Sequence, residues 1–204
     1  KIPGLILEGG SIESDGAGTL LTTSDCLLSP NRNPHLDRSG IERILAEQLG
    51  IHHFLWLDHG FLAGDDTDSH IDTLARLCPD ETIVYVRCDD EEDEHYPALR
   101  AMETELRALR TVRGRPYRLV ALPWPRPCYA EDGHRLPATY ANFLVINGAV
   151  LVPTYHDPQD AAALQILADI FADREIIGID CRPLIAQHGS LHCVTMQLPQ
   201  GVLP

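Results

Sequence analysis

The stretch that decides the fold is NFLVINGAVLV, which spans residues 142–152. Two apolar runs flank the dipeptide Asn147-Gly148, and both of its residues favour the left-handed backbone of a tight hairpin turn. An apolar pattern with helical spacing follows over residues 158–171, and a strand-like run closes the segment at 175–179. The sequence therefore predicts a unit of two strands, one helix and a third strand, in the order ββαβ.

Two earlier segments repeat this order. The first has its two strands, helix and closing strand at residues 5–7, 19–23, 38–48 and 54–57. The second has them at residues 70–77, 82–87, 97–110 and 117–122. A last strand-like run at 191–197 begins a further unit. The units start about 65–70 residues apart, so the chain contains an internal repeat.

An internal repeat of this kind favours a radial or stacked architecture over an ordinary doubly wound sheet. If the units surround an axis, their first strands meet at the centre, and residues at equivalent places converge on one site. We therefore expect a single domain over residues 1–204, of the α/β class, in which pseudo-symmetric ββαβ units are arranged radially or in a stack.

The composition narrows the classes of function. The chain has 204 residues, 44% of them hydrophobic, and a formal net charge of −14. This charge argues against nucleic acid and anionic membrane surfaces as partners, and no apolar run is long enough to cross a bilayer. The charge suits a small cationic substrate, although an acidic cytoplasmic enzyme of any kind has a similar balance.

Six cysteines stand at irregular spacings, and none of them forms a CxxC pair. A disulfide framework is not expected in a domain of this size, so the cysteines indicate a reducing cytoplasm. Free cysteines are commonly buried apolar residues, and we expect at most one or two of the six to carry chemistry.

Polar, reactive residues stand near the start of each unit. The first unit has Glu8, the second has His70 and Asp72, the third has Asn142, and the last fragment has Cys193. Together these side chains provide a nucleophile, an acid/base and acids that can bind a cation. Each residue alone also has a purely structural explanation, because buried thiols and His–Asp pairs on a strand face are common. The prediction depends on the whole set.

Metal binding is a weaker interpretation. The acidic residues of segment 65–68 resemble part of a calcium loop, but the glycine and the distal glutamate of such a loop are missing. His52, His53 and His192 have no partners at the spacing of a metal site. The sequence therefore predicts neither a metal nor an organic cofactor.

Several motifs, in order along nearly the whole chain, resemble the agmatine deiminase family, which includes the Porphyromonas-type peptidylarginine deiminases. These motifs lie at residues 7–10, 22–34, 65–72, 140–152 and 189–195. The family belongs to the guanidino-group-modifying enzymes, which are five-bladed α/β propellers. The resemblance thus implies that this chain holds about three of five blades.

The resemblance also implies a role for each candidate residue. Cys193 matches the nucleophile, His70 the general acid/base, and Glu8 the acid that orients the histidine. Asp72 matches a carboxylate that binds the guanidinium group, and Asn142 matches a substrate-binding position near the pocket. No metal or organic cofactor takes part.

Three departures from the family pattern concern the substrate and the extent of the chain. Ser69 stands where glycine is frequent, and Ser190-Leu191 replaces the usual Asn-Ile before His-Cys. The upstream motif Trp-x-Arg-Asp-x-Gly-Pro, which supplies a second guanidinium-binding carboxylate, does not occur. We therefore expect a single catalytic domain that lacks its N-terminal portion.

The predicted reaction is hydrolytic deimination of a small cationic guanidino compound through a covalent thiouronium on cysteine. Agmatine, which gives N-carbamoylputrescine and ammonia, is the expected substrate, and peptidyl or free arginine is the alternative. A propeller fragment that only binds or supports a partner is an alternative of another class. Relatives suggest a homodimer.

Overall fold

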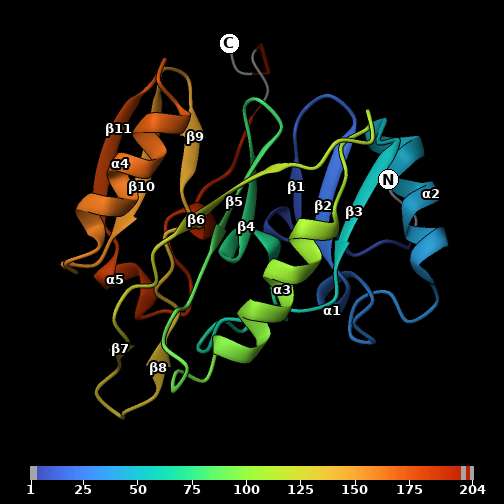
Figure 1. Cartoon of the computed structure of the whole chain (residues 1–204). Helices are drawn as coiled ribbons and strands as arrows, with labels where there is room; N and C mark the ends of the chain where they lie inside the picture. The colour runs from blue at the N-terminus through green and yellow to red at the C-terminus, as the bar shows by residue number, and fades with distance from the viewer. Residues whose placement is uncertain (1–3, 199–200, 203–204) are drawn as a thin grey trace.

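The computed structural model describes residues 4–198 and 201–202, and it is made of three similar units (Figure 1). In the first unit the strands and helix are β1 (Ile12–Ser14), β2 (Thr19–Thr23), α2 (Arg38–Leu49) and β3 (His53–Leu57). In the second they are β4 (Ala75–Cys78), β5 (Thr82–Val86), α3 (Tyr96–Ala108) and β6 (Arg118–Leu122). In the third they are β9 (Leu144–Ile146), β10 (Ala149–Thr154), α4 (Asp160–Ile170) and β11 (Glu175–Asp180). The predicted ββαβ order is confirmed in all three units.

Short elements connect these units or lie inside them. They are η1 (Gly9–Ser11), α1 (Ser24–Leu27), η2 (Ile71–Thr73), β7 (Cys128–Tyr129), β8 (Arg135–Leu136), α5 (Arg182–Ile185) and η3 (His192–Val194). The strands β7 and β8 pair as a short antiparallel hairpin between the second and the third unit.

Each unit forms a three-stranded sheet with the same topology. The second strand lies in the middle, antiparallel to the first and parallel to the third. A parallel pair needs a crossover connection, and the helix of each unit supplies it. All residues of β2 and β5 are buried, because a middle strand is covered on both faces. The middle strands therefore form much of the core.

Local sequence determines where the helix α2 begins and ends. The Asp37 carboxylate accepts a hydrogen bond from the backbone N–H of Gly40 at 2.8 Å, which caps the first turn. Gly50 ends the helix in the left-handed conformation, with φ of 72°. Ile41 and Leu45 of this helix are buried, whereas Leu49 in its last turn is 48% exposed.

The three sheets stand side by side, with the green second unit between the blue first unit and the orange third unit (Figure 1). Arg76 of β4 joins all three. Its Nε donates to Glu13 Oε2 of β1 at 2.9 Å, and its Nη1 donates to the carbonyls of Ala141 and Phe143 at 3.1 and 2.6 Å. The segments that open the three units therefore converge, as the repeat predicts.

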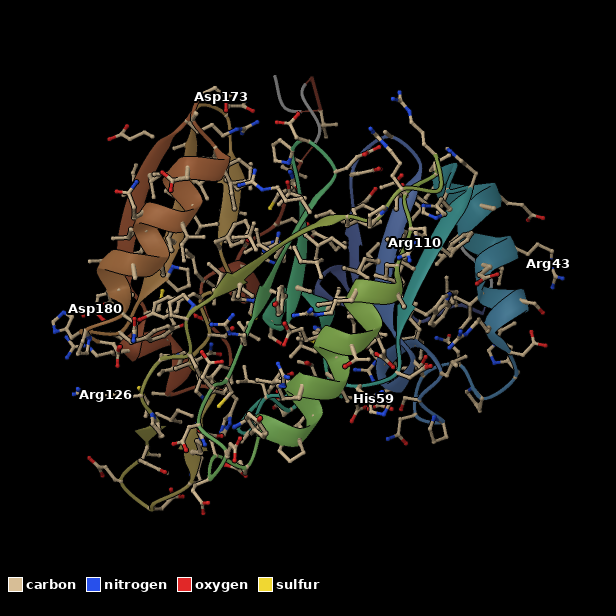
Figure 2. All side chains as sticks on the ribbon, in the orientation of Figure 1. Arg43, His59, Arg110, Arg126, Asp173 and Asp180 are labelled. Atoms are coloured by element: carbon tan, nitrogen blue, oxygen red, sulfur yellow. The ribbon has the colours of Figure 1, made fainter. Side chains whose placement is uncertain are left out.

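Many charged side chains project from the outside of this assembly. Arg43 of α2 and the acids Asp173 and Asp180 of the third unit lie at the periphery in Figure 2. The described residues contain no helix that is both long and apolar enough to cross a membrane.

Three predicted strands are wrong in position, and each has a local cause. Residues 5–7 form no strand, because the Asn33 amide bonds both backbone groups of Ile6, at 2.9 and 3.1 Å. The strand predicted at 70–77 begins only at Ala75, after the turn of η2. The run at 191–197 contains the 3-10 turn η3 instead, because the Asn142 carboxamide accepts from the backbone N–H of His192 at 2.8 Å.

The fold is thus of the mixed α/β class, as predicted. Within the described part of the chain the three sheets remain separate, and no sheet closes on itself.

Candidate functional site

A pocket of about 450 Å³ lies where the entry segments of the units meet. Its wall includes Glu8, which precedes η1, His70 and Asp72 at η2, and Cys193 in η3. Glu8, His70 and Asp72 are thus on the turns that lead into the first strands, not on the strands. The structure brings four of the five predicted site residues to one cavity.

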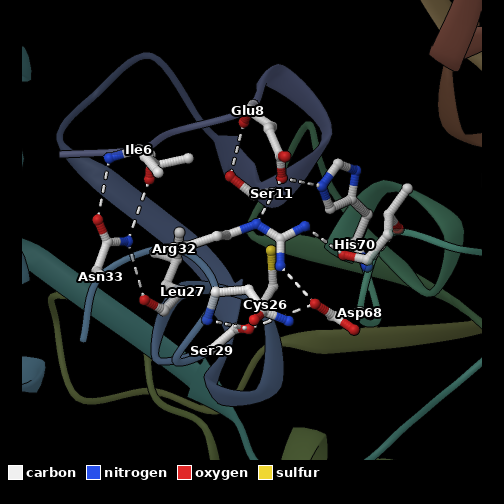
Figure 3. A network of polar contacts seen from close by, with 12 residues as sticks. Ile6, Glu8, Ser11, Cys26, Leu27, Ser29, Arg32, Asn33, Asp68 and His70 are labelled. Atoms are coloured by element: carbon white, nitrogen blue, oxygen red, sulfur yellow. Dashed lines mark hydrogen bonds and ion pairs between the residues drawn. The ribbon is translucent and has the colours of Figure 1, made fainter.

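Glu8 and His70 form the first pair of the site. Glu8 Oε2 lies 2.8 Å from His70 Nε2, and the pair is drawn in Figure 3. Burial alone raises the pKa of Glu8, but hydrogen bonds from His70 and Arg32 outweigh it and lower the pKa. An ionised carboxylate can only accept, so Nε2 of His70 carries the proton. Nδ1 is then the nitrogen that is free to accept a proton, and it lies close to Gly10 of the pocket wall.

Gly10 separates His70 from Asp72. A Cβ atom at this position would lie 2.6 Å from His70 Nδ1 and 2.8 Å from Asp72 Oδ2. Any side chain would therefore displace one of these two groups, and glycine is required by the close approach.

Asp72 is 1% exposed and is held on one side only. Its Oδ2 lies 2.7 Å from Nδ1 of His192, while its Oδ1 is buried without a hydrogen-bond partner among the described residues. A buried carboxylate oxygen without a partner is costly. Asp72 therefore offers one acceptor to a donor that enters the pocket.

Cys193 lies in η3, and the residue is exposed. Its Sγ is 3.5 Å from Oδ1 of Asn142, which also accepts from the backbone N–H of Cys193 at 3.4 Å. Although the residue reaches solvent, the protein around its sulfur removes water from the thiolate. This burial, followed by the charge of Asp72, raises the pKa of the Cys193 thiol. The surroundings of the sulfur thus favour the thiol over the thiolate.

Asn142 lies behind the pocket, not on its wall. The residue is fully buried, and its carboxamide faces the backbone of η3 on one side and the Asp72 carbonyl on the other, at 3.4 Å. Its contacts thus hold the cysteine turn. The substrate-binding role expected for Asn142 stays a prediction.

One set of side chains has the composition of a metal site. Glu8, His70 and the buried Cys26 place their ligand atoms within 4.8 Å of one another. However, burial raises the pKa of Cys26 to about 12, which leaves a neutral thiol. Arg32 also donates to the same Glu8 oxygen at 2.8 Å. A neutral thiol and an adjacent cation do not fit a divalent metal ion.

Sequence reasoning missed three residues that shape the site: Gly10, Arg32 and His192. Gly10 and Arg32 stand inside motifs that were noticed, but nothing in the spacing shows that they contact His70 or Glu8. His192 was considered only as a metal ligand, and in the structure it contacts Asp72 instead. Its position directly before the cysteine was the one available signal.

A thiol, an imidazole with a carboxylate partner and a second buried carboxylate thus share one pocket on repeated ββαβ units. The chain is therefore a mixed α/β protein with the side chains of a cysteine-dependent active site. The family model for Porphyromonas-type peptidyl-arginine deiminases matches residues 1–199, and the chain belongs to that family.

Similar proteins agree with this assignment. Agmatine deiminase from Pseudomonas fluorescens is 37% identical over 98% of this chain and 58% of its own length. A structure titled as the putative arginine deiminase from Porphyromonas gingivalis matches with a TM-score of 0.94 and 61% identity, over 98% of this chain and 58% of that chain. A substrate-bound variant of C. jejuni agmatine deiminase has a TM-score of 0.87 and 47% identity, over 93% and 55%. The chain thus spans about three fifths of the length of the curated relatives it matches.

Proposed function

We propose that this chain carries the nucleophile and the acid/base of a hydrolase that releases ammonia from a guanidino compound. The observation that supports this most directly is the pocket in which Cys193 shares a wall with His70 and Asp72. The unpartnered Oδ1 of Asp72 suits an N–H of a guanidinium group, because a charge-assisted hydrogen bond satisfies both.

The first half of the reaction forms a covalent intermediate. A guanidinium bound at Asp72 cancels the negative charge that disfavours the thiolate of Cys193. The thiol gives its proton to His70 Nδ1, and the thiolate attacks the guanidinium carbon. The bond from this carbon to one terminal nitrogen breaks, and His70 returns the proton to the departing ammonia. A thiouronium on Cys193 remains.

The second half returns the enzyme to its first state. Water gives a proton to His70 and adds to the thiouronium carbon, the carbon–sulfur bond breaks, and the thiolate regains that proton from His70, while the remaining hydroxyl proton of the product passes through solvent to the released ammonia. The product is a urea, and no oxidant or cofactor enters the balance. Glu8 holds His70 throughout, through the contact between Oε2 and Nε2.

Agmatine is the substrate that we favour. Relatives and solved structures with 37% and 47% identity bear the name agmatine deiminase. In the described part of the pocket wall, the charged residues are acids and histidines, with no Arg or Lys that could receive a carboxylate. Agmatine has no carboxylate, and its product is N-carbamoylputrescine.

Peptidylarginine is the second candidate, because the family model bears that name. Ammonia release from agmatine, free arginine and a peptide with C-terminal arginine, measured side by side, separates the two. We expect turnover of agmatine alone. Turnover of the peptide with agmatine inert would reverse the assignment.

The domain organisation of the whole protein is a further proposal. We propose one catalytic domain that closes as a five-bladed propeller, in which the three units described here are consecutive blades. A second guanidinium-binding carboxylate then comes from outside the present sequence. The intact mass of the natural polypeptide tests this: a mass equal to the present 204 residues, without turnover, would favour a fragment that only binds or supports a partner.

Three further expectations remain proposals. We place the protein in the cytoplasm, since all six cysteines are free thiols. We expect a homodimer and small cationic molecules as the binding partners, without nucleic acid or membrane. Analytical ultracentrifugation and cell fractionation test the dimer and the location.

A further inference from the structure

Arg32 is the centre of a polar network behind the pocket (Figure 3). Its side chain is 10% exposed, and its Nε donates to Glu8 Oε2 at 2.8 Å. Its Nη1 donates to Asp68 Oδ2 at 2.7 Å, and its Nη2 donates to the carbonyl of Thr67 at 2.8 Å. One guanidinium group thus joins three segments that are distant in the sequence.

The first arm of this network ends on the oxygen that holds His70. Glu8 Oε2 accepts from Arg32 Nε and from His70 Nε2, both at 2.8 Å. The Glu8 side chain is 44% exposed, so packing alone leaves it several rotamers. The other donors of the planar Arg32 guanidinium are already held by Thr67 and Asp68. Its Nε therefore selects the Glu8 rotamer whose carboxylate reaches the His70 imidazole.

The second arm holds the loop that leads into His70. Asp68 and Ser69 have φ angles of 57° and 62°, a left-handed conformation that is strained for residues other than glycine. Arg32 contacts this loop at Thr67 and Asp68, and the Thr23 hydroxyl donates to the Ser69 carbonyl at 2.8 Å. Arg32 therefore contacts both the acid partner of His70 and the backbone that carries His70.

We propose that Arg32 is a positioning residue for the acid/base His70. It fixes the Glu8 carboxylate against one imidazole nitrogen and fixes the preceding loop, so that the other nitrogen faces the pocket. Arg32 is not among the described residues of the pocket wall, so it acts through its neighbours. The inference rests on the proposed function, in which His70 moves protons.

The charges around His70 show what the loss of Arg32 does. Glu8 contacts the imidazole, Asp65 interacts with it electrostatically, and Asp72 faces it across Gly10. Arg32 is the cation that opposes these acids. Without it, Glu8 loses a hydrogen-bonded cation, so the pKa of Glu8 rises and the pH profile of kcat/KM changes with it.

The test uses Arg32→Met in the protein with its full natural sequence. We expect kcat to fall roughly 10- to 100-fold, a part of what acid/base catalysis contributes. KM should change by less than about threefold, because Arg32 is not among the described residues of the pocket wall. Arg32→Lys should recover part of kcat and of the pH profile, since it keeps the charge but not the fork.

A measurement without turnover separates this inference from the proposed function. Carboxyl-carbon NMR should show that the pKa of Glu8 rises in Arg32→Met. In Asp68→Asn, which removes only the ion pair between Arg32 and the loop, the pKa of Glu8 should stay at its wild-type value. An unchanged kcat and an unchanged Glu8 titration would overturn the inference. If Arg32→Met does not fold, the other two variants decide. A wild-type kcat and a wild-type pH profile in both Arg32→Lys and Asp68→Asn would also overturn the inference. If the wild-type protein deiminates nothing, the proposed function fails, and the Glu8 titration still decides the role of Arg32.

Discussion

His192 Nδ1 lies 2.7 Å from Asp72 Oδ2, although the two residues are 120 positions apart in the sequence. The residue directly before Cys193 thereby holds one oxygen of the buried carboxylate. One oxygen of Asp72 is occupied, and the other, Oδ1, remains for a ligand. The proposed nucleophile and the proposed guanidinium acceptor are thus joined through neighbouring residues.

Replacing Asp72 tests the acceptor. Asp72→Asn keeps the shape but loses the charge, so we expect agmatine to bind more weakly by about 1.5–3 kcal/mol, the range of a hydrogen bond to a charged group. Calorimetry in a Cys193→Ser background measures binding without turnover. Asp66→Asn, at an exposed acid nearby, is the matched control and should bind like its parent. Equal affinities in the two variants would remove Asp72 from the binding site.

Replacing Cys193 tests the nucleophile. A serine hydroxyl is a far weaker nucleophile than a thiolate, so Cys193→Ser should lower kcat by at least about 10³-fold. Ammonia release under saturating agmatine measures this. Cys128→Ser changes a half-buried thiol that is not on the pocket wall and should keep wild-type activity. A Cys193→Ser variant with normal turnover would sink the mechanism.

The pH dependence of alkylation reports on the Cys193 thiol. Burial and the charge of Asp72 raise its pKa, so the thiolate fraction at pH 8 is smaller than for an ordinary cysteine. The rate of reaction with iodoacetamide, followed by mass spectrometry, should therefore keep rising at pH values where a free thiol has levelled off. Asp72→Asn removes the nearby negative charge, so it should lower the pKa of the Cys193 thiol and speed its alkylation at pH 8. An identical profile in wild type and Asp72→Asn would contradict the electrostatic coupling.

Backbone strain at Ser69 predicts a stabilising substitution. A left-handed residue with a Cβ costs about 1–2 kcal/mol, and Ser69 has φ of 62°. Ser69→Gly relieves this strain but adds entropy to the unfolded chain, so we expect a net gain of up to about 1 kcal/mol in the free energy of unfolding. Urea denaturation measures it. The same change at Ser39, in the first turn of α2, should destabilise by about 0.5 kcal/mol. A loss at both positions would show that Ser69 is not strained.

The repeated order of elements could be predicted because apolar spacing reports which face of a strand or helix is buried. The middle strands β2 and β5 are covered on both faces and appear in the sequence as nearly continuous apolar or threonine runs. The strands predicted at residues 5–7 and 191–197 do not form, because Asn33 and Asn142 bond backbone groups that a strand would use. Such side-chain competition leaves no trace in hydrophobic periodicity.

The candidate site was only partly accessible to sequence reasoning. His70 and Asp72 lie close in sequence, and the repeat with the family motifs adds Glu8 and Cys193. Arg32 could not be found in this way. Its contacts join residues 24 and 36 positions away, and only the folded loop shows which carboxylates it reaches.

Arg76 makes the three repeats dependent on one another. Its guanidinium group is buried, with a carboxylate partner in the first unit and carbonyl partners at the entry of the third. If one unit detached alone, the Arg76 charge would lose its partners. This loss would cost about 3–5 kcal/mol of free energy. The repeats therefore should not melt one after another like the modules of a solenoid. They are similar in design but are not interchangeable parts, and they should lose their structure in one cooperative transition.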